Sequence, residues 1–379
     1  MKILIIIPSM TSGGAEHVVA DMTARWCKSH EIHLLTFSNK NKDFYKVSPL
    51  VVRYDMEGRK RKIWNLKAQF SIIKKIKSVT KNIQPDIVIS FIHKANIYSS
   101  FALWGSHIPL VLSESSLINR SDVPVHISLL RKLLYPRAFK LVVLSESIKR
   151  ELLMTIPKVY ETDVVAIPNP IDVSEKKDQV EPLNEFTGQN LDGKKIIISV
   201  GRLIPLKSFD HLIKAIKEVK SKGSGFHLVI IGEGEERANL ESIIQREDLL
   251  ECVSLPGRTN SVLSYLEQAD FSISTSQLEG FGMAVIESLA VGTPVLAYDA
   301  PGVRDLIKHG YNGELVPYGD IHLLSERIIR WLEDEDICKS YIKNTREVVN
   351  QYSCKNVDSI WETEVFELVV KESKLVKKI

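Results

Sequence analysis

Two glutamates, Glu279 and Glu287, stand eight positions apart in the segment TSQLEGFGMAVIESLAVGTPVLAYDAPG, residues 275–302. The residues around them are mainly glycines and apolar side chains, which is an unusual setting for two carboxylates. Carboxylates held in this way can accept hydrogen bonds from the hydroxyl groups of a ribose or of another sugar. The alternative is a pair of solvated carboxylates on a helix face, which the apolar neighbours disfavour.

The elements on either side of these glutamates must bring them together. The apolar segment FSISTS ends near Ser276 and is typical of a buried strand, and Gly280 and Gly282 open a helical pattern. Because helical side chains lean toward the helix N-terminus, Glu287 can reach back toward Glu279. In a parallel sheet, this joint lies at the carboxyl edge, where ligands bind.

Two cations follow another strand-like segment, in SVGRLIPLKSFDHL, residues 199–212. Arg202 comes directly after the strand, and Lys207 stands where the next helix begins. Two cations and a helix N-terminus can hold a diphosphate and offset its charge as it leaves. The alternative is a surface ion pair of Arg202, for example with Asp210.

The first half of the chain has two candidate loops of its own. Gly13 and Gly14, in PSMTSGGAEH, let the backbone approach a diphosphate, although a plain tight turn explains this pair of glycines equally well. His93 follows the strand-like segment DIVIS and can hydrogen-bond a sugar hydroxyl, although a lone histidine is more often structural.

Apolar strand-like segments alternate with helical patterns along all 379 residues. This alternation predicts an α/β protein with two Rossmann-like, doubly wound domains and a cleft between them. We expect residues 1–175 to form the first domain and residues 190–356 to form the second. The polar stretch 172–194 is expected to link them, and a helix over 357–379 is expected to pack back onto the first domain.

Charge is distributed unevenly over the chain. Residues 1–180 hold 27 Lys and Arg against 16 Asp and Glu, whereas the remainder holds 23 against 31. The stretch 59–77 combines many cations with an apolar face of Ile63, Leu66, Phe70 and Ile73. This pattern predicts an anionic membrane surface as a partner of the basic N-terminal domain, and the alternative is a helix packed on the first sheet. No basic, aromatic-interleaved motif for nucleic acid is present.

Membrane-spanning and metal-binding signals are missing from the sequence. No apolar run reaches the roughly 18 residues that a spanning helix needs, and MKILIIIPSM fits a buried strand better than a signal peptide. The four cysteines show neither CxxC nor metal spacing, which favours reduced thiols and a cytoplasmic location.

Four motifs in this order give the chain a family resemblance: SGGAE, IPNPID, GRL-x3-K and Glu279-x7-Glu287. Together they resemble the retaining glycosyltransferases of family 4, which have the GT-B fold. The resemblance runs over nearly the whole chain and is strongest from about 194 to 320. It implies a donor site made of Gly13, Gly14, Arg202, Lys207, Arg258, Glu279, Phe281, Gly282, Met283 and Glu287.

The resemblance also implies roles for these residues. Arg202 and Lys207 would hold the diphosphate, Glu279 would contact the transferred sugar, and His93 would lie near that sugar. Glu287 would bind the ribose. Arg258 would belong to the loop that holds the base, the amides of Phe281, Gly282 and Met283 would lie beside the transferred sugar, and Gly14 would close over the phosphates. The family needs no metal, and this sequence has no DxD-type carboxylate pair, so we expect no cofactor.

The implied reaction moves a hexose or N-acetylhexosamine from a nucleotide-diphosphate sugar, with UDP expected, to a hydroxyl of a glycan. Similar bacterial enzymes extend glycans on polyprenyl diphosphate, which predicts a peripheral location on the cytoplasmic face of the membrane. Relatives carry SEH where this chain has SESS, residues 113–116, and the acceptor side differs there. Two other classes are open: a nucleotide-sugar epimerase of the same fold and a non-catalytic nucleotide-sugar-binding subunit.

Overall fold

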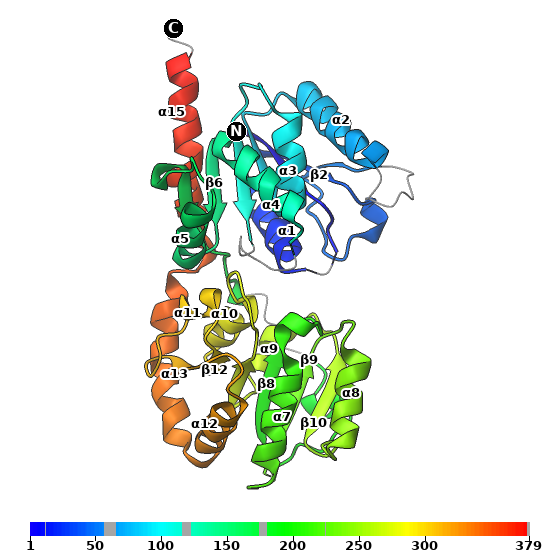
Figure 1. The fold of residues 1–379 in the computed structure, drawn as a ribbon, viewed down its shortest axis with the longest axis vertical. Helices are drawn as coiled ribbons and strands as arrows, with labels where there is room; N and C mark the ends of the chain where they lie inside the picture. Colours follow the sequence, from blue (N-terminus) through cyan, green and yellow to red (C-terminus); the bar gives the residue numbers. More distant parts are fainter. Residues whose placement is uncertain (12, 57–65, 116–122, 174–179, 224, 377–379) are drawn as a thin grey trace. The chain divides into compact units, whose positions relative to one another are not determined.

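The computed structural model describes residues 1–11, 13–56, 66–115, 123–173, 180–223 and 225–376. The chain divides into two compact units. Unit 1 comprises Met1–Asn169 together with Val357–Ile379, and unit 2 comprises Pro170–Asn356. The chain therefore returns to unit 1 after completing unit 2 (Figure 1).

Unit 1 contains, within the described residues, a seven-stranded parallel sheet in the order β3-β2-β1-β4-β5-β6-β7. The strands are β1 Lys2–Ile7, β2 Glu31–Thr36, β3 Val52–Tyr54, β4 Ile87–Phe91, β5 Leu110–Glu114, β6 Lys140–Val143 and β7 Val164–Ala166. The helices between them are α1 Gly14–Trp26, α2 Leu66–Ile83, α3 His93–Ala102, α4 Val125–Leu134 and α5 Glu146–Thr155. The central strands are buried on both faces, which explains their continuous apolar sequences.

The segment that returns to unit 1 packs against α1. It consists of the end of α14 (Cys354–Trp361), a π-helical turn over Glu362–Phe366, and α15 (Glu367–Val376). The rings of Trp361 and Phe366 lie edge-on to Trp26, with centroids 5.4 and 5.1 Å away. Asp358 accepts hydrogen bonds from Arg25 Nε at 2.7 Å and from Trp26 Nε1 at 3.1 Å. These residues belong to the same buried cluster as one face of β1, so the segment completes the core of unit 1.

The described part of unit 2 contains a six-stranded parallel sheet in the order β10-β9-β8-β11-β12-β13. The strands are β8 Lys195–Val200, β9 Phe226–Ile231, β10 Val253–Gly257, β11 Phe271–Ser274, β12 Val295–Tyr298 and β13 Gly313–Val316. The helices are α6 Leu183–Thr187, α7 Phe209–Lys220, α8 Arg237–Arg246, α9 Val262–Leu266, α10 Met283–Ala290, α11 Pro301–Arg304, α12 Ile321–Glu333 and α13 Glu335–Asn350. The doubly wound architecture predicted for both halves is confirmed (Figure 1).

The stretch 172–194 is more than a linker. Helix α6 lies within it, and Leu183 and Leu191 are buried in a cluster with Ile196 and Ile198 of β8. The boundary between the units falls at Asn169, a few residues before the expected end of the first domain. Polar composition alone did not reveal that two leucines fix this stretch to unit 2.

Each sheet has one position where the direction of strand addition reverses. In unit 1 this position lies between β1 and β4, and in unit 2 it lies between β8 and β11. Crossover helices leave the sheet on opposite faces there, which opens a crevice at the carboxyl ends of the two central strands. The loops after β1, β4, β8 and β11 are therefore the positions where each unit can receive a ligand.

The apolar face predicted on the stretch 59–77 is not the face that α2 packs inward, and its contact with a membrane stays a prediction. Residues 57–65, which include Ile63, lie outside the described residues, and Phe70 is 64% exposed. Helix α2 instead buries a different stripe, formed by Ala68, Ile72, Ile76, Val79 and Ile83. The alternative is thus correct for one face of the helix, because this stripe packs α2 onto unit 1.

Candidate active site

The loops after β8 and β11 meet at the point of reversal in unit 2. Lys207 Nζ donates a hydrogen bond to Glu279 Oε1, and Ser276 Oγ donates to the same oxygen at 2.9 Å. Thr275 Oγ1 donates to the carbonyl oxygen of Lys207 at 2.9 Å. Two residues separated by 72 positions in the sequence are thereby held together at one edge of the sheet.

The ion pair of Lys207 and Glu279 is partly shielded from water. The two side chains retain only 19% and 17% of their exposed surface. An ammonium group has three hydrogens, and the bond to Glu279 uses one of them, so Lys207 can still donate to an anion. Glu279 is oriented by two donors, which fixes a carboxylate where a sugar hydroxyl could be received.

Arg202 lies at the same edge and is exposed. Among the described residues, its side chain has no hydrogen bond or ion pair. The surface pair considered for it does not form, since Asp210 instead pairs with Lys214 Nζ at 2.8 Å. An exposed guanidinium beside Lys207 in the same loop is suited to bidentate binding of phosphate oxygens.

The N-terminus of α10 supplies backbone donors beside Glu279. Gly282 is the residue before the helix, and Met283 is its first residue. The amides of Phe281 and Gly282 have no acceptor within the described part of the chain, whereas the Phe281 ring is buried against Tyr352 with centroids 5.5 Å apart. Phe281 therefore contributes its backbone to the site and its side chain to the core. The partial positive charge of a helix N-terminus favours an anion here.

The remaining predicted residues of unit 2 lie on neighbouring elements. Glu287 is half-buried on α10, and the exposed Arg258 directly follows β10. β10 is the edge strand of the sheet, next to β9, so Arg258 is separated from the loop after β8 by one strand. Their assignment to ribose and base stays a prediction.

Unit 1 presents its own candidate residues at the reversal between β1 and β4. Gly13 precedes α1, and Gly14 is the first residue of that helix. His93 is the first residue of α3, immediately after β4. The two loops predicted independently from the sequence therefore follow neighbouring strands and lie at the same edge of the sheet.

The residue before His93 has an unusual backbone. Ile92 has a φ of +72°, a conformation that β-branched residues rarely adopt. Its amide donates to Ser113 O of β5 at 3.2 Å, and its carbonyl accepts from Asn96 N at 3.0 Å. Strained residues of this kind persist where the surrounding structure enforces them, and they concentrate at functional sites.

Sequence reasoning missed several residues that support the site. Ser276 and Thr275 orient the ion pair, as described above. Gly302 lies against the loop of Glu279, because its amide donates to Glu279 O at 3.1 Å and an added Cβ would stand 2.6 Å from Gly280 C. Gly234 likewise lies against the loop of Arg202, since a Cβ there would stand 2.2 Å from Leu203 O. In the sequence, the dipeptide PG contains Gly302 and the segment GEGEE contains Gly234, and these two motifs could have indicated the close approaches.

Metal-ligand clusters and membrane-spanning helices were the two remaining features to look for. Among the described residues, no group of three or more His, Cys, Asp or Glu could hold a metal ion. The same part of the chain has no helix with the length and apolarity to cross a bilayer.

The two units are doubly wound α/β folds, a class in which ligands bind at the carboxyl edge of the sheet at a point of reversal, and here cations, a carboxylate and a helix N-terminus lie at that edge. Two family models match, one for each half: Glycosyltransferase Family 4 over residues 12–175 and Glycosyl transferases group 1 over residues 182–348. Together they span most of the chain. The chain belongs to the family 4 glycosyltransferases, as the motifs indicated.

Relatives and solved structures agree with this assignment. An uncharacterized glycosyltransferase of Haemophilus influenzae is 26% identical, over 93% of this chain and 96% of the relative. A Campylobacter jejuni enzyme is 27% identical, over 95% and 97%; its name is GalNAc-alpha-(1->4)-GalNAc-alpha-(1->3)-diNAcBac-PP-undecaprenol alpha-1,4-N-acetyl-D-galactosaminyltransferase. Anabaena HepE in complex with UDP and glucose superimposes with a TM-score of 0.78, at 18% identity and 100% coverage of both chains. This last likeness confirms the GT-B fold.

Proposed function

We propose that this glycosyltransferase moves a hexose or an N-acetylhexosamine from a UDP-sugar to a hydroxyl of a glycan carried on polyprenyl diphosphate, with retention of the anomeric configuration. The observation that carries the proposal is the junction of Lys207, Glu279 and Ser276 beside the N-terminus of α10. The names of the Campylobacter and Anabaena proteins, which mention undecaprenol and UDP, support the acceptor and the donor.

The cations account for the binding and departure of the diphosphate. Arg202 and Lys207 would donate to its oxygens, and the N-terminus of α10 would add backbone donors. Charge that develops on the leaving diphosphate is then offset by side chains, so we expect the reaction to need no metal. Glu287 would bind the ribose hydroxyls, and Arg258 would belong to the loop around the base.

Glu279 would position the transferred sugar. Its carboxylate is already oriented by Lys207 and Ser276, so it can accept a hydrogen bond from a sugar hydroxyl with little further ordering. In the proposed step, the bond from C1 to the diphosphate oxygen breaks while a bond from C1 to the acceptor oxygen forms on the same face. The acceptor proton passes to the departing diphosphate. His93, supported by the strained Ile92, would contact the donor sugar.

Replacing Glu279 by Gln tests this proposal. The variant should lose transfer by at least about 100-fold, because the amide cannot replace the carboxylate as a charged acceptor, while its affinity for UDP changes little. The assay incubates a UDP-sugar with a polyprenyl-diphosphate-linked glycan in EDTA, with UDP release and mass spectrometry of the product as readouts. NMR of the new linkage reports the anomeric configuration.

Controls separate the alternatives from one another. Glu333→Gln, at the end of α12, provides the same change away from the loops after β8 and β11 and should leave transfer intact. Conversion of a UDP-sugar to its epimer without an acceptor would instead identify an epimerase. UDP binding without any turnover would identify a binding subunit, and an inverted product would refute retention.

A further inference from the structure

Helix α4 of unit 1 carries an apolar ridge that faces solvent. Val125, Leu129 and Leu133 are 76%, 61% and 53% exposed. Their spacing of four residues places them along one side of the helix. The opposite side is buried, with Arg131 and Leu134 each 1% exposed. The helix is therefore apolar on its outer side as well as on its inner one, which packing within unit 1 does not require.

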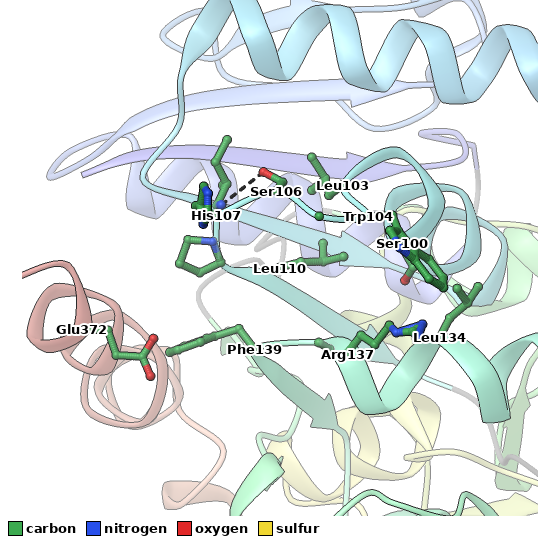
Figure 2. A pocket seen from close by; sticks show the side chains of 14 residues that line it. Ser100, Leu103, Trp104, Ser106, His107, Leu110, Leu134, Arg137, Phe139 and Glu372 are labelled. Carbon is green, nitrogen blue, oxygen red and sulfur yellow. Dashed lines mark hydrogen bonds between the residues drawn. The ribbon is translucent and has the colours of Figure 1, made fainter. Parts of the chain in front are cut away.

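Cations border this ridge. Lys132 is exposed on one side of it, and the exposed Arg137 ends the 3₁₀ turn Tyr135–Arg137 that follows the helix. The guanidinium of Arg137 lies 3.8 Å above the ring of Trp104, which is itself 51% exposed. Figure 2 shows these two side chains beside Leu134 at a cavity of about 320 Å³. An exposed tryptophan next to arginine and apolar side chains is typical of surfaces that meet the boundary of a lipid bilayer.

The neighbouring helices extend the basic character of this surface. Helices α2 and α4 both pack against α3 and belong to one layer of unit 1 (Figure 1). The outer side of α2 exposes Phe70 among four lysines, Lys67, Lys74, Lys77 and Lys81. Unit 1 as a whole contains 29 Lys and Arg against 18 Asp and Glu, a net charge of +11. Unit 2, with 21 against 29, is net negative.

We infer that the outer surface of the α2–α3–α4 layer is a docking surface for an anionic lipid bilayer, and that the ridge Val125, Leu129 and Leu133 of α4 enters the boundary between headgroups and acyl chains. The lysines of α2 would attract the anionic headgroups. The ridge would add a second contribution to binding, because its apolar side chains would be buried in the bilayer. The inference rests on the proposed function, since a polyprenyl-linked acceptor is held at such a surface, but the test below does not require turnover.

Charge complementarity favours an anionic bilayer over a second copy of the chain as the partner of this surface. A ridge bordered by cations would have to meet the same cations in a symmetric dimer, which is unfavourable. An anionic bilayer offers both the apolar phase and the opposite charge.

The substitution Leu129→Glu tests the inference in the full-length protein. Sedimentation with phosphatidylcholine vesicles, with and without phosphatidylglycerol, measures binding. The parent should bind only the vesicles that contain phosphatidylglycerol, and Leu129→Glu should bind them at least roughly tenfold more weakly, because a charge replaces an inserted side chain. Leu50→Glu is the matched control: it makes the same change in unit 1 at a residue that is 69% exposed and lies outside this layer. It should bind like the parent.

Each outcome has a definite meaning. Equal binding by Leu129→Glu and Leu50→Glu, or no lipid binding by the parent, would overturn the inference. A parent dimer that Leu129→Glu dissociates in the absence of lipid would assign the ridge to self-association instead. Thermal shift with UDP keeps the two proposals separate. If UDP stabilises Leu129→Glu as much as the parent, the donor site of the variant is intact. If UDP does not stabilise the parent, that result counts against the proposed function alone.

Discussion

At the scale of single residues, the ion pair of Lys207 and Glu279 serves two purposes. It stabilises the meeting of two loops, and it orients both groups before any ligand binds. The pair is only partly exposed, so its electrostatic attraction is less screened than that of a surface pair. Arg202 has no such partner within the described residues, which leaves its guanidinium able to move toward a ligand.

Lys207→Ala should weaken UDP binding roughly 10- to 150-fold, the range expected for a hydrogen bond to a charged group worth about 1.5–3 kcal/mol. Isothermal titration with UDP measures this change. Lys214→Ala removes a lysine of α7 that is paired with Asp210, and it should leave the affinity unchanged. If both variants bind UDP as tightly as the parent, Lys207 does not contact the diphosphate.

Sequence reasoning reached the charged residues of the site but not the partners that orient them. Glu279 was recognisable because its neighbours are glycines and apolar residues, and Lys207 because it follows a strand at the edge where ligands bind. Ser276 and Thr275 were not, because hydroxyl residues are common at strand ends and nothing distinguishes a donor to Glu279 from a solvated side chain. The strain at Ile92 was also unpredictable, because a positive φ in an isoleucine contradicts its own preference.

At the scale of elements, three of the four helices that begin at the points of sheet reversal follow a residue with a positive φ. The residues immediately before α3, α7 and α10 are Ile92, Ser208 and Gly282, with φ of +72°, +47° and +92°, whereas the residue before α1 is extended. Ile92 is the single residue between β4 and α3, so its left-handed backbone turns the chain sharply from strand to helix and keeps the N-terminus of α3 close to the sheet edge. Two of these three residues are not glycine, so their positive φ lowers the stability of the fold.

Gly302→Ala should lower both stability and activity. The new Cβ would stand 2.6 to 2.7 Å from backbone atoms of Gly280 and Phe281, so the loop of Glu279 must shift. We expect a loss of about 1–3 kcal/mol in the free energy of unfolding and a larger loss of transfer than of UDP binding. Denaturant titration and the transfer assay check this. Gly223→Ala is the control, because no atom lies within 4 Å of its added Cβ; equal behaviour of the two would contradict the steric argument.

Most strands and helices were predictable because their apolar runs, or their apolar residues at helical spacing, extend over enough residues to show a pattern. The edge strands β3 and β7 were missed, since three residues show no periodicity. The sequence pattern also did not show which face of α2 packs inward. Apolar residues occupy two sides of this helix, and only the sheet decides that Ile72 and Ile76 are buried while Phe70 is exposed.

At the scale of the whole molecule, a buried histidine links the stability of the fold to pH. Within unit 2, His227 of β9 is fully buried, and its Nε2 lies 3.1 Å from Ser254 Oγ. Burial, aided by the positive charge of Lys194, lowers the pKa of His227 to about 4. The unfolded chain therefore binds a proton near pH 6.5 that the folded protein does not bind until about pH 4.

Stability should accordingly fall as the pH is lowered from 6.5 toward 4. His227 alone would account for about 3 kcal/mol of this loss, because a shift of one pKa unit corresponds to about 1.4 kcal/mol. His227→Gln should reduce the pH dependence of the free energy of unfolding, whereas the exposed His107→Gln should not. Chemical denaturation at a series of pH values provides the measurement. A parent and a His227→Gln variant with parallel pH profiles would remove this explanation.

The return of the chain to unit 1 has a consequence for biosynthesis. Unit 2 is continuous, whereas the core around Trp26 lacks Trp361 and Phe366 until ribosomes have passed Phe366. At ordinary elongation rates, the 187 residues of Pro170–Asn356 take roughly 10–40 s to translate. Throughout that interval, the nascent first half presents Trp26 of α1 without its covering rings, which is the period when a chaperone would have most reason to bind it.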